Sequence, residues 1–251
     1  MKFLIKAIFK LQIWLSSLEA KVLRAIQIGD TAVHKVGGIA INWKLRLPPD
    51  AYIIEVGAYN GNDSAYFAQT FPTGKVISFE PDLILYGQLL KKSQIWPNIT
   101  CFPYAVAEKT GICTFFSSDG GSRASGSIKM PTIHLELFPD VVFPKDKRQR
   151  VVSVSLDEFL LSETKMIDLI WIDAQGAELD VLKGAVNCLK RTSFVFCEVS
   201  SRPIYSEGAN FIEVRDFLLS LDFKLIASDV VLESNEIVEH GNALFGQPHS
   251  Y

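Results

Sequence analysis

The chain reads Tyr52-Ile53-Ile54-Glu55-Val56-Gly57-Ala58-Tyr59-Asn60-Gly61, an apolar run that ends in an acid and two glycines four residues apart. Such a run predicts a buried parallel strand, a tight turn and a helix whose free amide groups face a ligand. A second run, Val76-Ile77-Ser78-Phe79, ends in Glu80, 23 residues after Gly57. An α/β fold places the carboxylate that binds a ribose at about this distance. The carboxyl ends of consecutive parallel strands lie at the same sheet edge, so the glycine turn and Glu80 should lie together there. We therefore expect a nucleotide-type cofactor site at this edge.

The glycine spacing restricts the cofactor. Gly57 and Gly61 form G-x-x-x-G, whereas the dinucleotide fingerprint is G-x-G-x-x-G, in which the second glycine lets the backbone approach a pyrophosphate. Ala58 and Tyr59 leave no glycine at that place, and no Gly-Lys-Ser or Gly-Lys-Thr follows as in a Walker loop. S-adenosylmethionine, which has a ribose and no phosphate, is therefore the leading candidate.

Apolar runs and helical patterns alternate from residue 52 onward, which is typical of a doubly wound parallel sheet in an α/β fold. The predicted strands are 52–57, 75–80, 99–105, 167–173, 193–199, 223–228 and 241–246, and the predicted helices are 63–71, 82–93, 178–191 and 210–221. The interval 111–150 interrupts this rhythm with a polar, glycine-rich segment over residues 117–127. We interpret 111–150 as an insertion, or as a lid over the ligand edge.

Residues 1–28 carry apolar residues at helical spacing, with Lys2, Lys6 and Lys10 on another stripe, and predict a basic amphipathic helix. The lysines interrupt the apolar centre that a signal peptide or a transmembrane span needs. Two interpretations remain: the helix packs on the core or on a partner chain, or it lies on an anionic membrane surface. We divide the chain into an N-terminal amphipathic helical extension, 1–48, and one domain, 49–251.

Composition narrows the class of partner. The chain has 251 residues, 48% of them hydrophobic, which is enough for one sizeable α/β core. A net charge of -3 argues against a nucleic-acid partner held by phosphate contacts and favours a small molecule. The four cysteines form no C-x-x-C pair, which favours free thiols in the cytoplasm. No cluster of histidine and cysteine supports zinc, and we predict no metal.

A second acidic cluster follows the later strands. Asp173 ends one apolar run and Glu198 ends the next, so both reach the edge that holds Gly57. Glu178 falls in the first turn of a predicted helix, where its charge suits the helix dipole, but Asp173 has no such local role. The candidate catalytic residues are Asp173 first, then Glu198 and His134.

Four motifs follow one another in the order Glu55–Gly61, Phe79-Glu80-Pro81, Leu156–Leu160 and Ile172–Ala185. In this order they resemble the FkbM family of S-adenosylmethionine-dependent methyltransferases, over roughly residues 50 to 246. The resemblance implies a class I methyltransferase (Rossmann-like) three-layer sandwich, with a seven-stranded, mostly parallel sheet whose last strand is antiparallel. It also implies O-methylation of a hydroxyl on a sugar, a glycan or a secondary metabolite.

The resemblance assigns residues to the cofactor. Glu80 would bind the ribose hydroxyls, Tyr104 and Ala105 would lie near adenine, and Asp173 would lie by the methionyl end. The full set is Glu55, Gly57, Ala58, Asn60, Gly61, Glu80, Pro81, Tyr104, Ala105 and Asp173. Two residues depart from the family pattern: Trp171, where the family often has lysine, and Gln175, where it often has glutamate.

Three functional classes follow. The leading one is a cytoplasmic O-methyltransferase, or one peripheral at the inner face of a membrane, that works by in-line methyl transfer. The second is a nicotinamide-dependent oxidoreductase, which the missing G-x-G-x-x-G disfavours. The third is a non-catalytic scaffold that binds a cofactor and is recruited through the N-terminal helix. The remaining histidines, His34, His240 and His249, have no chemical context in the sequence.

Overall fold

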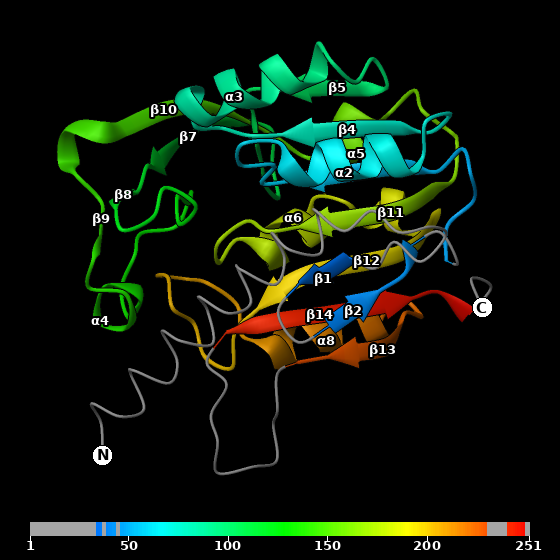
Figure 1. Ribbon diagram of the computed structural model, residues 1–251. Helices are drawn as coiled ribbons and strands as arrows, with labels where there is room; N and C mark the ends of the chain where they lie inside the picture. The colour runs from blue at the N-terminus through cyan, green and yellow to red at the C-terminus, as the bar shows by residue number, and fades with distance from the viewer. Residues whose placement is uncertain (1–33, 37–38, 44–45, 230–239, 249–251) are drawn as a thin grey trace.

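Seven strands form the central sheet of the computed structural model, which describes residues 34–36, 39–43, 46–229 and 240–248. Their order across the sheet is β13-β14-β12-β11-β3-β4-β5, with β14 antiparallel to both neighbours and the other neighbouring pairs parallel (Figure 1). The bounds are β3 Tyr52–Val56, β4 Lys75–Phe79, β5 Ile99–Phe102, β11 Ile167–Ile172, β12 Thr192–Val199, β13 Lys224–Ser228 and β14 Gly241–Gly246. This topology confirms the predicted class I methyltransferase fold.

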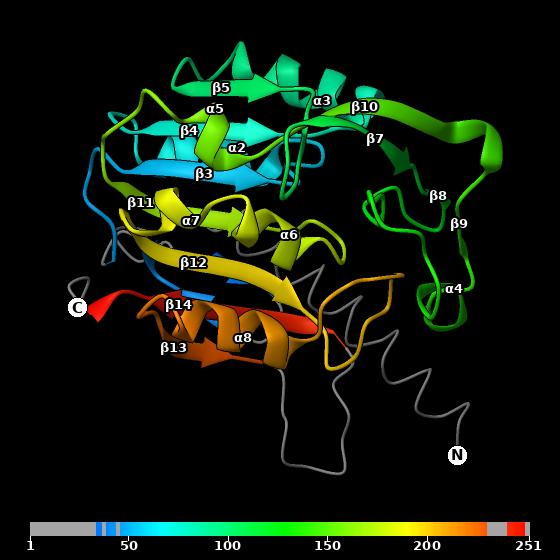
Figure 2. The ribbon, with the colours of Figure 1, turned by 180° about the vertical axis from the view of Figure 1, so that it is seen from behind.

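Helices cover both faces of the sheet. Figure 1 shows α2 (Asn62–Thr70) and α3 (Leu83–Ser93) with one face toward the viewer, and Figure 2 shows α5 (Leu156–Phe159), α6 (Glu178–Lys183), α7 (Val186–Leu189) and α8 (Phe211–Leu219) on the other. In β3, Ile54 and Val56 join the core under α5 to α8, while Ile53 joins the core under α2. Because both faces are covered, the strand is apolar throughout most of its length.

Two predicted elements are divided in the structure. The helix predicted over 178–191 splits into α6 and α7, because the Asp157 carboxylate accepts the N–H groups of Asn187 (2.9 Å) and Cys188 (2.8 Å) and so starts a new helix. The strand predicted over 99–105 ends at Phe102. A separate strand, β6 (Ala105–Val106), pairs with β10 (Arg148–Val154) in a second sheet. The other predicted elements agree with the structure to within two residues at each end.

The interval 111–150 contains regular structure. β7 (Gly111–Phe116) pairs antiparallel with β10, and between them lie β8 (Asp119–Gly120), α4 (His134–Leu137), β9 (Val141–Val142) and the 3-10 helix η2 (Lys145–Lys147). Figures 1 and 2 place this insertion outside the carboxyl ends of the parallel strands, where it extends away from the sheet. The division of the chain at 111–150 and the role of this segment as a lid stay predictions.

Residues 39–43 and 46–47 pack on the domain. Residues 1–33, with the predicted amphipathic helix, lie outside the described residues. β1 (His34–Val36) and β2 (Ile39–Ile41) form an antiparallel hairpin, so the expected helical extension is wrong at these residues. Trp43 is fully buried, with its ring centroid 6.3 Å from each of Phe67, Trp171 and Phe196. Among the helices that the structure describes, none is long and apolar enough to cross a membrane.

Replacing Trp43 by Ala is expected to lower the free energy of unfolding by about 3–5 kcal/mol, because a large buried ring is removed and a cavity remains. Urea denaturation measures the change. Leu161→Ala is the matched control: this side chain is 84% exposed, so its removal is expected to change stability by less than about 0.5 kcal/mol. Equal effects of the two substitutions would contradict the placement of Trp43 in the core.

Candidate cofactor and active site

The turn after β3 brings two strand ends together. The Gly57 and Ala58 N–H groups donate to the Phe79 carbonyl at 3.0 Å and 2.9 Å, and the Asp173 N–H donates to the Val56 carbonyl at 2.9 Å. Gly57 has φ 81°, and a Cβ atom at this position would lie 1.8 Å from the Asp173 carbonyl oxygen. A side chain at residue 57 would therefore force β3 and β11 apart at this edge.

Glu80 follows β4 on the same edge. Its two carboxylate oxygens accept the N–H groups of Tyr59 and Asp82, each at 2.8 Å, and the side chain is buried. Burial raises the pKa of Glu80 to about 8, although the two N–H donors act to lower it. These bonds orient the carboxyl group, and in its ionised form each oxygen keeps a second acceptor site, so the carboxylate can receive a pair of hydroxyl groups.

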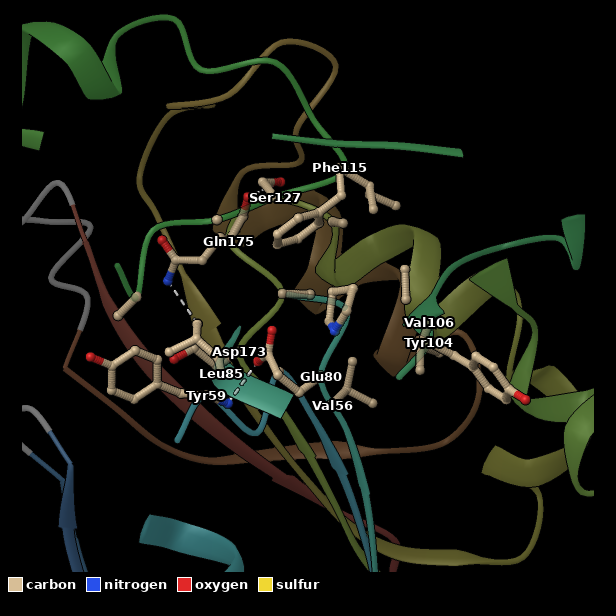
Figure 3. A pocket seen from close by; sticks show the side chains of 18 of the residues that line it. Val56, Tyr59, Glu80, Leu85, Tyr104, Val106, Phe115, Ser127, Asp173 and Gln175 are labelled. Atoms are coloured by element: carbon tan, nitrogen blue, oxygen red, sulfur yellow. Dashed lines mark hydrogen bonds between the residues drawn. The ribbon is translucent and has the colours of Figure 1, made fainter. Parts of the chain in front are cut away.

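A cavity lies between these strand ends and the insertion (Figure 3). Its wall includes the apolar residues Leu85, Ala105, Val106 and Phe115, the aromatic Tyr104, and the polar residues Asp63, Asp173 and Gln175. Figure 3 shows Tyr104 and Val106 on the opposite side from Asp173 and Gln175. The wall also includes Gly126, Ser127 and Ile128 from the insertion. The combination of an apolar end, the oriented Glu80 and a polar end fits a nucleoside joined to a charged, amino-acid-like part.

Six of the ten residues predicted for the cofactor line this cavity: Gly57, Glu80, Pro81, Tyr104, Ala105 and Asp173. Ala58, Asn60 and Gly61 do not line it and instead shape the turn. Ala58 is buried, Asn60 accepts a hydrogen bond from Lys92 through its carbonyl at 2.7 Å, and Gly61 begins α2 with φ 77°.

Glu55 is also outside the cavity, and its prediction as a cofactor residue is corrected. Neighbouring side chains on a strand point to opposite faces, so Glu55 lies across β3 from Val56. There its carboxyl group accepts the Ser64 hydroxyl and, at 2.7 Å, the Ser78 hydroxyl. Burial raises the pKa of Glu55 to about 8, with Asp63 acting in the same direction. Glu55 therefore links β3, β4 and α2 as a largely neutral buried acid.

The predicted catalytic acids are joined by Gln175. Its side-chain amide donates to Asp173 Oδ1 at 2.7 Å and to Glu198 Oε2, and Figure 3 shows Gln175 directed at Asp173 on the cavity wall. Desolvation and the neighbouring Glu198 carboxylate raise the pKa of Asp173. Glu198 does not itself line the cavity; it neighbours Asp173 directly and is also joined to it through Gln175. Glu178 accepts the N–H groups of Ala174 (3.1 Å) and Gly176 (3.0 Å), as expected of a residue at a helix start.

His134 lies near this network without reaching the cavity. The side chain is buried in α4, with ring centroids 4.9 Å from Phe138, 5.4 Å from Phe143 and 5.2 Å from Tyr205. Burial lowers the pKa of His134 to about 4, so the ring is neutral at pH 7. A neutral, aromatic-packed histidine suits a structural role better than the predicted catalytic one.

Sequence reasoning missed His240 and the link through Gln175. His240 Nε2 lies 2.6 Å from Glu198 Oε1. Antiparallel pairing of β14 with β12 puts Asn242 opposite Glu198, so the residues before β14 return to the carboxyl edge. Applying the predicted antiparallel direction of this strand would have placed His240 there. Within the part of the chain that the structure describes, no group of three or more His, Cys, Asp and Glu side chains is arranged to hold a metal ion.

Replacing Gly57 by Ala is expected to destabilise the protein, because the new methyl group would meet the Asp173 backbone and φ is positive. The loss should exceed about 1 kcal/mol in urea denaturation. Gly87→Ala is the control within α3, where an added Cβ meets nothing within 4 Å, and it should stabilise by about 0.5–1 kcal/mol. A stable Gly57→Ala variant would refute the close approach.

Replacing Glu55 by Gln is expected to flatten the pH dependence of stability. Because the folded pKa is raised to about 8, the native state holds a proton that the unfolded state loses above about pH 4.5. The contribution of Glu55 to the free energy of unfolding of the wild type therefore falls as pH rises from about 4.5 to 8. Urea denaturation between pH 5 and 7 should show the variant gaining roughly 1 kcal/mol or more on the wild type. A constant difference would contradict the buried neutral acid.

Comparison with known proteins agrees with this geometry. The methyltransferase FkbM domain model matches residues 55–225. The 2-O-methyltransferase NoeI of Sinorhizobium fredii is 31% identical over 203 residues, which cover 75% of this chain and 82% of that protein. Methyltransferase sdnD of Sordaria araneosa is 25% identical over 163 residues, 55% of this chain and 61% of its own.

Among solved structures, the Aeropyrum pernix fibrillarin structure with natively bound S-adenosyl-L-methionine is 10% identical, with a TM-score of 0.47, covering 79% of this chain and 68% of that one. The family assignment rests on the domain match, which spans most of the chain, and on NoeI, which is similar over most of its own length. The chain therefore belongs to the FkbM family of S-adenosylmethionine-dependent methyltransferases.

Proposed function

We propose that this protein transfers a methyl group from S-adenosylmethionine to a hydroxyl group of a sugar, a glycan or a secondary metabolite. The observation that carries the proposal is Asp173, a carboxyl group that lines the cavity and is oriented by Gln175 from behind. Hydroxyl groups are weak acids, and a positioned carboxylate that takes the proton during attack assists their methylation. The 2-O-methyltransferase NoeI, a relative that acts on an oxygen by name, supports the choice of acceptor atom.

The residues of the cavity suit the cofactor part by part. Glu80 would receive the ribose hydroxyls, since both of its oxygens are already oriented by backbone N–H groups. Tyr104, Ala105 and Val106 would hold the adenine at the apolar end. Asp63 and Asp173 would face the charged end, where a carboxylate favours a nearby positive charge.

When bound, S-adenosylmethionine supplies an electrophilic methyl group on a positively charged sulfur. The protein's part is to hold the acceptor oxygen in line, to take its proton at Asp173 and to exclude water. The insertion contributes to exclusion of water: the Ser127 hydroxyl donates to the Gln175 carbonyl at 2.8 Å, and the Tyr205 hydroxyl donates to the Ser125 carbonyl at 2.9 Å. These bonds hold the insertion across the cavity, which supports its interpretation as a lid.

Family membership decides against the nicotinamide-dependent alternative. For the non-catalytic scaffold and for peripheral membrane binding, residues 1–28 are the segment of interest. We propose a cytoplasmic protein in which this segment packs on the domain or a partner, or binds an anionic membrane. Sedimentation with anionic liposomes tests the membrane alternative, which fails if the full chain and a chain that begins at Asp30 behave alike.

The function is tested by incubating the protein with methyl-labelled S-adenosylmethionine and a fractionated extract of metabolites and glycans. Label is expected in a base-stable ether on a hydroxylated acceptor. Glu80→Ala should weaken cofactor binding in calorimetry by roughly 10- to 100-fold, because about 1.5–3 kcal/mol of hydrogen bonding is lost. Glu108→Ala, an exposed acid outside the cavity, is the control. Binding of NAD in preference to S-adenosylmethionine, or labelling of nitrogen or carbon alone, would overturn the proposal.

A further inference from the structure

His240 and Glu198 form an ion pair next to the cavity. The Nε2–Oε1 distance is 2.6 Å, and the two side chains are 26% and 19% exposed. The exposed pair of Lys165 and Asp50 is looser: the two groups are 3.7 Å apart and 48% and 64% exposed. His240 Nδ1 is buried and has no hydrogen-bond partner among the described residues. The imidazole is therefore committed to Glu198 through one nitrogen, as in a pair whose carboxylate orients the ring.

The pair sits in a group of acids. Charged and titratable groups face His240 from several elements: His134 of α4, Glu178 of α6, Glu198 of β12 and Asp229 after β13. Asp173, directly after β11, faces Glu198. Burial acts to raise the pKa of Glu198, but the ion pair with His240 outweighs it and lowers the pKa. Burial acts to lower the pKa of His240, and Glu198 outweighs it in turn and raises the pKa.

Glu198 lies within hydrogen-bonding reach of Asp173, and the Gln175 side-chain amide also joins the two carboxyl groups. The Gln175 nitrogen has two N–H donors, directed at Asp173 Oδ1 and at Glu198 Oε2, while its oxygen lies 3.0 Å from the Tyr205 hydroxyl. Both donors are used only if Glu198 presents an acceptor oxygen. If Glu198 were protonated, its hydroxyl group would be a donor and would no longer accept the Gln175 N–H group. Gln175 could then rotate away from Asp173.

We propose that His240 is a positioning residue for methyl transfer: it keeps Glu198 ionised, so that Glu198 and Gln175 hold Asp173 in the orientation that meets the acceptor hydroxyl. The inference rests on the proposed function, in which Asp173 takes the proton. His240 acts through Glu198 and Gln175 and does not line the cavity. Because His240 does not line the cavity, its loss should affect turnover and leave cofactor affinity intact.

The first test is a double-mutant cycle with His240→Gln and Glu198→Gln. His240→Gln should lower kcat by roughly 10- to 100-fold, as expected when a reacting group loses its orientation. Affinity for S-adenosylmethionine in calorimetry should change less than about twofold. Because the two residues act as a unit, the double variant should be no slower than the slower single variant. His240→Lys, which restores a cation, should recover part of the activity, and Lys165→Gln is the control for loss of an exposed ion pair.

The second test follows protonation directly. Nuclear magnetic resonance of the histidine ring in the wild type should give His240 a pKa above the usual 6.5, and Glu198→Gln should lower it. In the wild type, kcat should fall as pH rises through the pKa of His240, since the imidazolium is the active form. His240→Gln should lack this falling limb.

The outcomes separate the two proposals. Absence of methyl transfer by the wild type would overturn the proposed function, and the role of His240 with it. Transfer by the wild type with unchanged kcat in His240→Gln, with additive effects in the cycle, or with an equal loss of cofactor affinity would overturn the role of His240 alone. If His240→Gln does not fold, the wild-type titration decides, since a His240 pKa at or below the usual value of about 6.5 would exclude the ion pair.

Discussion

The site depends on one close contact between backbones. Asp173 at the end of β11 donates its N–H to Val56 at the end of β3, and its carbonyl oxygen fills the space that a side chain at Gly57 would need. This contact holds the turn after β3 against the segment that carries Asp173 and Gln175. With Phe79 accepting the next two N–H groups, the ends of three strands form one rigid wall. A cofactor cavity lined by backbone needs such a wall, because small displacements change every contact with the ligand.

Buried carboxyl groups in and around this wall are the second feature of the site. Glu55, Glu80 and Glu178 each accept hydrogen bonds from hydroxyl or N–H groups, and burial raises the pKa values to about 8, 8 and 7. Such groups orient the turns but lower stability as pH rises, because the charged form is costly to bury. Glu198 differs, since His240 supplies a counter-charge and the carboxylate stays ionised. The protein thus holds a largely neutral Glu80 at the cofactor wall and an ionised Glu198 behind Asp173.

Much of the fold and of the cofactor site was predictable from the sequence, and each wrong prediction has a physical reason. The carboxyl ends of parallel strands share one edge, which placed Glu80 and Asp173 at the cavity correctly. Glu55 was assigned there by resemblance alone, although alternation along a strand puts it on the opposite face from Val56. The helix over 178–191 looked continuous because its interruption comes from Asp157, which lies outside the segment. His240 had no local context, since its partner is 42 residues away in sequence.

The sequence by itself determined the sheet, the class of cofactor and two of the carboxyl groups that face the cavity, Glu80 and Asp173. These follow from apolar runs, glycine spacing and the direction of parallel strands, all of which are local patterns that repeat along the chain. Only the tertiary structure decided which side chains contact Asp173 from outside the cavity, and which contacts hold the insertion beside the cavity. The contacts of Gln175 with Glu198, of Glu198 with His240 and of Tyr205 with Ser125 join residues 23, 42 and 80 positions apart. They depend on how strands and insertion pack, and no periodic pattern in the sequence records that packing.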